Sequence, residues 1–307
     1  MKLAPVIVFA FNRPDTLADT LTTLKQNTLA DKTDLYVFVD GPRNEDDKIK
    51  ISKVKNILDN LHGFQSQTIT YSNTNKGLAQ SIISGTTEII NKYGKVIVVE
   101  DDLYLSKSFL TFMNQALDIY QSDQRIFQIS GFGVKITPPK DYQADVYLHN
   151  RAQSWTWGTW KDRWDTVDWQ VSDYKKLCKD KKKQQEFNTG GSDLFGMLKG
   201  FMEGKNNSWF IRFTYSMFKQ GKYGITPIIS LVKNEGFRAD STHCDSYNRY
   251  KIEFLTDIKT NFILPPNLQF NKDLSKQAYK YWGIPYRIYG KVRTYMIKTK
   301  RFFLQKL

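Results

Sequence analysis

The first hundred residues alternate short apolar runs with amphipathic helical segments, and this order constrains the fold more than any other feature. Val, Ile, Leu and Phe dominate Pro5–Phe11, Leu35–Val39 and Lys95–Val99. Strands that are buried on both faces have such continuous apolar runs, whereas half-exposed strands alternate apolar and polar residues. A fourth, shorter strand is predicted at Thr68–Tyr71, and a helical pattern follows each strand. This β-α-β order predicts an α/β fold with a doubly wound, mostly parallel sheet.

The second half of the chain is less regular. It contains a predicted strand at Arg125–Ile129, an aromatic-rich stretch from Trp155 to Trp160, a helix at Trp209–Lys219 and a strand at Ile225–Val232. The chain has 307 residues, of which 40% are apolar and 25% charged, so it has the composition of a globular protein rather than a disordered one.

Cysteine content, apolar run length and the first residues of the sequence bear on the cellular compartment of the protein. Two cysteines, Cys178 and Cys244, exclude a disulfide framework and favour a reducing compartment. The longest apolar runs are far shorter than the ~20 residues of a membrane span. Asn12 and Arg13 come too early in the chain for a signal peptide. We therefore expect a cytoplasmic protein.

Positive charge is concentrated after residue 271. The formal net charge is +14, and Lys272–Leu307 holds ten Lys or Arg residues and one acid. Such charge favours an anionic partner, which composition alone leaves open among nucleic acid, phosphate-bearing substrate and acidic membrane. Aromatic residues alternate with the basic ones, which is typical of peripheral attachment to an anionic membrane. The alternative is an ordinary packed helix with solvated lysines. No nucleic-acid-reading motif accompanies the charge, so we expect no nucleic acid partner.

Polar side chains follow three of the predicted strands at the point where each strand ends. These are Asn12 and Arg13, then Asp40, and finally Glu100–Asp102. Ligands bind beyond the carboxyl ends of parallel strands, so these groups are expected at one edge of the sheet. Three successive acids favour a divalent metal, Mg²⁺ or Mn²⁺, with Asp102, and also Asp101, as ligand. The alternative is a solvated acidic cap on the following helix.

Asp40 and Arg13 each have two interpretations. Asp40 either makes a plain Asp-Gly-Pro turn or binds a base or ribose. Arg13 either neutralises phosphate and stacks on a base or is an exposed turn residue. Motifs of a P-loop, a dinucleotide fingerprint, a nucleophile elbow and an EF-hand are absent from the sequence.

The sequence resembles GT-A glycosyltransferases, and most of all family-two glycosyltransferases and the N-acetylglucosaminyltransferase I type. The latter type carries Glu-Asp-Asp as its version of the Asp-x-Asp motif. The resemblance covers about residues 4–245. It lies in Pro5–Pro14, Val39–Gly41, Asn73–Leu78, Val98–Asp102, Ser230–Phe237 and Ser241–Cys244.

The resemblance implies roles for the residues at these positions. Asp102 would bind the metal, and His243 would be a second metal or diphosphate contact, unless it is simply a capped loop histidine. Asp40 would meet the nucleotide base and Arg13 would lie beside the nucleotide. In the same implied donor site, Glu100 and Asp101 would support sugar and ribose.

Two further assignments concern the sugar and the acceptor. Trp157, with its neighbours in the tryptophan stretch, either packs against donor or acceptor sugar or belongs to the core. An inverting transferase needs a general base for the acceptor hydroxyl, and the resemblance places it near Trp209. No carboxylate stands there, so the candidates are the nearest upstream acids, Asp193 first and Glu203 second.

These observations and the resemblance predict a metal-dependent glycosyltransferase that moves a hexosyl or N-acetylhexosaminyl group from a nucleotide-diphosphate donor to a growing surface glycan or lipid-linked acceptor. Inversion at the anomeric carbon is implied by the resemblance alone. We expect a GT-A domain over 1–265, with a nucleotide-binding half at 1–104 and an acceptor half at 105–265. Residues 266–307 would be a basic, aromatic tail at the inner membrane face. The alternatives are a non-catalytic basic module that binds membrane or nucleic acid and, third, a nucleotide-sugar pyrophosphorylase.

Overall fold

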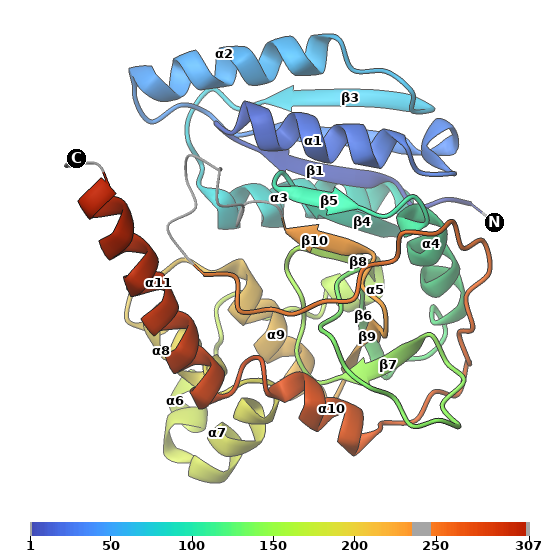
Figure 1. Ribbon diagram of the computed structural model, residues 1–307, viewed down its shortest axis with the longest axis vertical. Helices are drawn as coiled ribbons and strands as arrows, with labels where there is room; N and C mark the ends of the chain where they lie inside the picture. The colour runs from blue at the N-terminus through green and yellow to red at the C-terminus, as the bar shows by residue number, and fades with distance from the viewer. Residues whose placement is uncertain (1, 235–246, 305–307) are drawn as a thin grey trace.

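The computed structural model describes residues 2–234 and 247–304. Within these residues, eight strands form one mixed sheet in the order β3-β2-β1-β4-β8-β6-β9-β7, and β10 and β5 form a second, two-stranded sheet. Four of the seven strand pairs in the large sheet are parallel. The predicted α/β class, with a mostly parallel central sheet and a C-terminal helix, is confirmed (Figure 1).

The strands are β1 (Val6–Ala10), β2 (Asp34–Val39), β3 (Ser66–Tyr71), β4 (Lys95–Glu100), β5 (Leu103–Leu105), β6 (Ile126–Ser130), β7 (Val146–His149), β8 (Thr156–Trp160), β9 (Tyr223–Pro227) and β10 (Val232–Asn234). The helices are α1 (Pro14–Lys25), α2 (Glu45–Asp59), α3 (Leu78–Tyr93), α4 (Phe109–Ile119), α5 (Lys161–Trp164), α6 (Tyr174–Lys179), α7 (Lys181–Phe187), α8 (Leu194–Met202), α9 (Trp209–Lys219), α10 (Lys272–Tyr279) and α11 (Ile284–Leu304). Short 3₁₀ helices lie at Ala30–Lys32 (η1) and Asn188–Gly190 (η2).

Successive side chains of the central strands point to opposite faces and enter two separate cores. In β1, Val6 and Val8 pack with α1, α2 and α4, whereas Ile7 and Phe9 pack with α3 and α9. All five residues of β1 are buried. The continuous apolar run in the sequence is therefore explained by a strand that helices cover on both faces.

The path of the chain changes direction at β1. From β1 it passes to β2 and β3 on one side, and then returns to β4 on the other side, with β1 parallel to both β2 and β4. Such a switch leaves a crevice beyond the carboxyl ends of β1 and β4, because the two connections leave in opposite directions.

The apolar run Ile225–Val232 is predicted as one strand, but the structure divides it between two strands. Its first residues belong to β9 in the large sheet and its last residue to β10 in the small sheet, with Ser230 between them. The hydroxyl of Ser230 donates to the carbonyl of Val232, and its backbone amide bonds to the carbonyl of Glu253, so the chain is diverted out of the large sheet at this residue. The tryptophan stretch, for which no strand is predicted, contains β8, which pairs antiparallel with β4.

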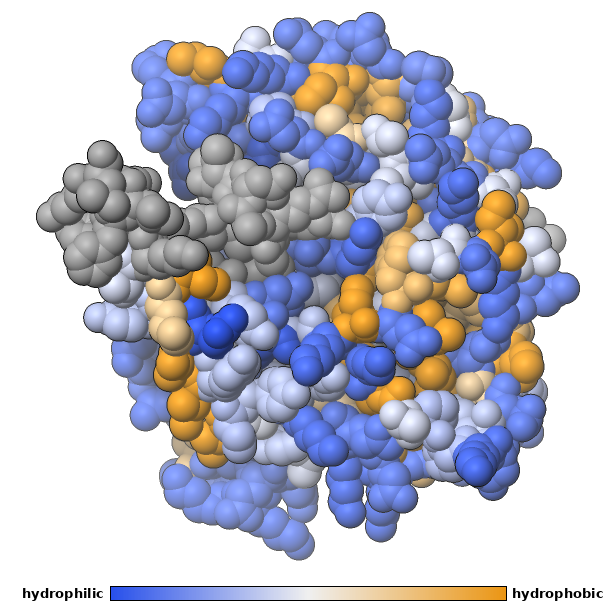
Figure 2. All heavy atoms as spheres, viewed as in Figure 1, coloured by the Kyte–Doolittle hydropathy of each residue, from blue (hydrophilic) through white to orange (hydrophobic). Residues whose placement is uncertain are grey.

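The basic tail continues the main core across the expected boundary at residue 265. Leu268, Leu274, Ala278 and Trp282 are buried in the same cluster as β1 and α4. α11 follows along one edge of the molecule (Figure 1), where apolar side chains gather on its visible side (Figure 2). Over the described residues, no helix is both long enough and apolar enough for a membrane span.

Candidate functional site

The carboxyl ends of the neighbouring strands β1 and β4 carry predicted site residues. Arg13 follows β1, Glu100 ends β4, and Asp101 and Asp102 come directly after it. The Nη1 of Arg13 donates to Oδ2 of Asp102 at 2.9 Å, and its Nη2 donates to Oδ1 of Asp101. Arg13 therefore bridges the two aspartates, as the shared sheet edge predicts.

The turn that carries the three acids is fixed from both sides. On one side, the hydroxyl of Thr20 in α1 donates to the carbonyl of Leu103 and accepts from its amide, both at 2.9 Å. On the other side, β10 pairs antiparallel with β5 and places Asn234 opposite Leu103. The Nδ2 of Asn234 donates to Oδ1 of Asp102 at 3.3 Å. Asp102 thus has a defined orientation, with Arg13 on one oxygen and Asn234 on the other.

The acids carry more negative charge than Arg13 offsets. Burial, together with the charges of Asp102 and Asp101, raises the pKa of Glu100 well above its ordinary range. Burial also raises the pKa of Asp101 to about 6, although Arg13 opposes this shift. Raised pKa values of neighbouring carboxyl groups indicate an environment that a further cation would stabilise.

The oxygen atoms at Asp102 suit a hard divalent cation whose remaining ligands would be phosphate oxygens. The described residues contain no cluster of three or more His, Cys, Asp or Glu side chains able to hold a metal by themselves. However, Mg²⁺ is commonly bound by one or two protein oxygens together with substrate phosphates and water. The Oδ1 of Asn234 is buried without a hydrogen-bond partner, on the same amide group that contacts Asp102. His243, the other predicted metal contact, lies outside the described residues.

Asn234 is a site residue that the sequence analysis did not single out. It stands in the stretch Ser230–Phe237 that carries the family resemblance, but no motif marks it by itself. The small sheet brings it to Asp102 from 132 positions further along the chain. Only the strand pairing of β10 with β5 reveals this proximity.

Asp40 is engaged with a loop on its own side of the sheet. Its Oδ1 accepts from the amides of Gly41 at 2.9 Å and Lys76 at 2.8 Å. Its Oδ2 accepts from the amide of Gly77 at 2.9 Å and from Nδ2 of Asn75 at 3.1 Å. The carboxylate therefore holds the loop that leads into α3, and its role toward a nucleotide base stays a prediction.

The glycines of this loop show why the contact is tight. Gly77 has φ of 75°, a conformation that residues with a side chain rarely adopt. A Cβ on Gly41 would lie 2.4 Å from the carbonyl carbon of Thr74, so only glycine allows the two backbone segments to approach.

The two predicted base candidates both pair with cations. Asp193 forms a buried, bidentate ion pair with Arg151, at 2.9 and 3.1 Å, and the guanidinium of Arg151 lies over the rings of Phe210 and Trp282. Burial alone raises the pKa of Asp193, but the charge and hydrogen bonds of Arg151 outweigh it, and the pKa is lowered. Glu203 is bonded by Lys205 at 2.6 Å, which lowers its pKa as well. Lowered pKa values make both groups weaker proton acceptors. Their assignment as base stays a prediction.

Trp157 has the second of its two interpretations, a place in the core. Its side chain is fully buried, stacked on Trp164 with ring centroids 5.7 Å apart and also in contact with Trp209 and Phe213. It lies in the cluster between the sheet and α9. The tryptophan stretch is thus largely a packing feature.

A second hollow lies away from these acids. It has a volume of about 720 Å³ and is lined by residues that include Asn150, Lys222, Tyr223, Phe270 and Tyr279. Tyr223 begins β9, and Asn150 follows β7, which pairs antiparallel with β9, so the hollow lies at the amino end of β9 and the carboxyl end of β7.

No protein-family model and no curated protein matches the chain. Among solved structures, it is similar to the mannosyltransferase PcManGT from Pyrobaculum calidifontis, in complex with GDP-Man and Mn²⁺ (13% identity, TM-score 0.34), over 52% of this chain and 45% of that one. It is also similar to S. aureus TarS 1-349 (16% identity, TM-score 0.35), over 52% of this chain and 47% of that one. For TarS 1-349 in complex with UDP, the values are 19% identity, TM-score 0.30, and 46% and 37% coverage. The chain spans less than half the length of each, and similarity this low supports no conclusion about activity.

Proposed function

We propose that this chain is a metal-dependent, inverting glycosyltransferase that uses a nucleotide-diphosphate sugar and a hydroxyl acceptor on a surface glycan or lipid-linked glycan. One observation supports this most strongly. Arg13, Asp101, Asp102 and Asn234 meet in the crevice at the switch point of the sheet. Such crevices bind nucleotides in open α/β sheets. A guanidinium group beside oxygen ligands for a cation matches the charge of a diphosphate.

Each residue of the cluster has a proposed task. Asp102 and the amide oxygen of Asn234 would hold the cation, which when bound offsets charge that develops on the leaving diphosphate. Arg13, which is partly exposed, would turn toward a phosphate oxygen once a donor arrives. Asp101 is almost fully buried and would keep the guanidinium within reach of the site.

The transfer itself requires one displacement at the anomeric carbon. The bond from this carbon to the diphosphate oxygen breaks, the bond to the acceptor oxygen forms on the opposite face, and the acceptor proton passes to a base. Asp193 or Glu203 is proposed as this base. Each would first have to leave its cation partner, Arg151 or Lys205.

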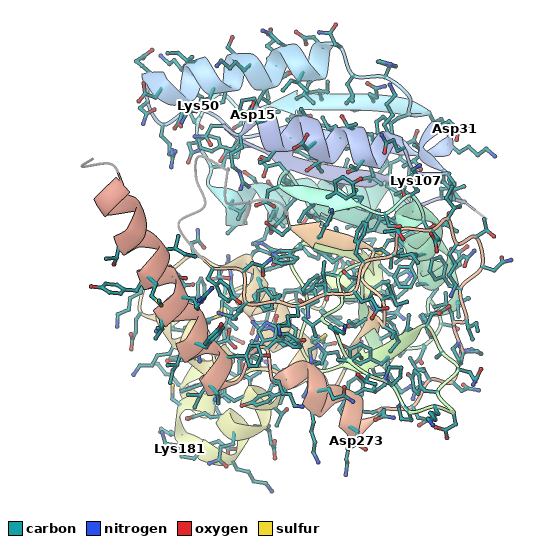
Figure 3. The ribbon with its side chains drawn as sticks, viewed as in Figure 1. Asp15, Asp31, Lys50, Lys107, Lys181 and Asp273 are labelled. Atoms are coloured by element: carbon teal, nitrogen blue, oxygen red, sulfur yellow. The ribbon has the colours of Figure 1, made fainter. Side chains whose placement is uncertain are left out.

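Calorimetric binding of UDP and GDP, and of UDP- and GDP-sugars, with and without Mn²⁺ tests the proposal. We expect Mn²⁺ to strengthen binding of one nucleotide series, and Asp102→Asn to abolish this increase while the protein stays folded. Asp31→Asn is the matched control, because Asp31 is exposed in η1, beyond the end of α1 that is opposite to Asp15 in its first turn (Figure 3). The control should bind as the parent does.

Arg13→Gln provides an independent measurement on the same site. Hydrogen bonds to a charged group contribute about 1.5–3 kcal/mol, so nucleoside diphosphate affinity should fall roughly tenfold or more. The proposal fails if the parent protein binds no nucleotide with Mn²⁺ present. It also fails if Asp102→Asn keeps full Mn²⁺-dependent affinity.

A further inference from the structure

Helix α11 is held to the body of the protein along one side only. The Nη1 of Arg287 donates to the hydroxyl of Ser192 at 3.0 Å, and the hydroxyl of Thr294 accepts from the amide of Tyr247 at 3.0 Å. Gly290 is buried between these two contacts, beside Arg249. Residues on this side recur at helical spacing, whereas described side chains on the opposite side of α11 are more than half exposed.

The uncovered side is apolar. Ile284, Ile288, Val292 and Met296 recur every four residues and are 60, 57, 52 and 56% exposed, and Tyr295 beside them is 73% exposed. We call these five residues the α11 stripe. Figure 2 shows apolar side chains gathered along this edge of the molecule. Single exposed apolar residues are ordinary on protein surfaces, but a continuous stripe of them marks a contact with a partner or a membrane.

Basic residues border the stripe. Lys291 and Lys298 lie on one side of it by helical spacing and Arg293 lies on the other, and all three are exposed. The sequence of α11 contains six Lys or Arg residues and no acid. An apolar stripe between rows of cations is typical of helices that lie in the interface of an anionic bilayer. Two copies of this face would instead bring like charges together.

We propose that α11 lies in the plane of an anionic membrane surface, with the α11 stripe among the acyl chains and the bordering lysines and arginine at the lipid phosphates. This assigns the contact to one face of one helix rather than to the whole basic tail, since α10 and Trp282 are packed into the core. α11 runs along the side of the molecule toward which the arrow of β3 points (Figure 1), and β1 and β4 run parallel to β3 through β2. The bound helix would therefore keep the strand ends facing the membrane side.

Co-sedimentation of the full chain with vesicles tests the proposal. The vesicles contain either phosphatidylcholine with phosphatidylglycerol or phosphatidylcholine alone. We expect the parent to pellet with the anionic vesicles at low salt and to be released at about 1 M NaCl, where the screening length is roughly 3 Å. Pelleting with the neutral vesicles should be much weaker.

Two variants separate the apolar and the charged contributions. The stripe variant, Ile288→Ser with Val292→Ser, should reduce partitioning roughly tenfold or more, because buried methylene groups are lost. The charge variant, Lys291→Gln with Lys298→Gln, should lose most of the preference for anionic over neutral vesicles. The matched control is Ile49→Ser with Ile258→Ser, which removes two isoleucines that are 62 and 58% exposed elsewhere. It should bind as the parent does.

Light scattering without vesicles tests whether a second copy of the chain, rather than a membrane, covers the α11 stripe. A parent that is dimeric, with a stripe variant that is monomeric, would identify the stripe as a contact between two copies and overturn the proposal. A parent that stays in the supernatant with anionic vesicles at low salt overturns it too, as does a stripe variant that pellets as well as the parent.

Discussion

Asp40→Asn separates a structural role of this residue from a role in ligand binding. The substitution keeps the size of the side chain but replaces one carboxylate oxygen with an NH₂ group. In the parent, each oxygen accepts two hydrogen bonds from the Gly41 and Asn75–Gly77 segments. The amide can accept only one pair, so the other two donors would face an NH₂ group.

The expected loss follows from these contacts. Hydrogen bonds to a charged acceptor contribute about 1.5–3 kcal/mol each, so the loss of two lowers the free energy of unfolding by about 3 kcal/mol or more. Such a value is a large fraction of the stability of an ordinary domain. We expect the amide of Lys76 or that of Gly77 to exchange faster with solvent as well, because the two amides bond to different oxygens of Asp40 and one of these becomes the NH₂ group.

Guanidinium denaturation at pH 7, followed by tryptophan fluorescence, measures the change in stability. Asp141→Asn is the control, because Asp141 is exposed in a turn, and its effect should stay within about 0.5 kcal/mol. An Asp40→Asn protein with the parent's denaturation midpoint would refute the loop assignment. If its nucleotide affinity alone falls, Asp40 is a ligand contact, as the sequence suggested.

Three further predictions concern the core and the site. Burial lowers the pKa of His149 to about 3, with Arg151 adding to the shift, so His149 stays neutral in the fold while its unfolded form protonates below about pH 6.5. Stability is therefore lost as pH falls from 6.5 toward 3, and between pH 7 and 5 His149→Leu should lose about 2 kcal/mol less than the parent in denaturation experiments. Asp193→Asn should destabilise the fold by about 3–5 kcal/mol at pH 7, because Arg151 would be buried unpaired; full stability with a roughly hundredfold lower turnover would instead identify Asp193 as the base. Asn234→Leu should weaken Mn²⁺ binding measured by electron paramagnetic resonance without nucleotide, whereas unchanged Mn²⁺ affinity would remove Asn234 from the cation site.

The ordered strand ends were predictable because they depend on local patterns. Apolar runs define β1, β2 and β4, and parallel strands place their carboxyl ends at one edge, so sequence order predicts that Arg13, Asp101 and Asp102 lie at the same edge. Their contact also depends on β1 and β4 being neighbours in the sheet. The sequence also predicts a helix at Trp209–Lys219, and α9 has these same bounds.

Contacts between distant segments were decided only by the tertiary structure. Trp157 has a ring of the kind that can stack on a sugar, but the strand register of β8 places this side chain in the core between the sheet and α9. Asp193 is predicted from the sequence as the general base, and the structure adds that Arg151, 42 residues earlier, pairs with it. Asn234 carries no motif, yet it reaches Asp102 because β10 leaves the large sheet at Ser230 and pairs with β5. Sequence periodicity shows which side of an element is buried, but the partner on that side depends on how separate elements pack, and local pattern does not contain that information.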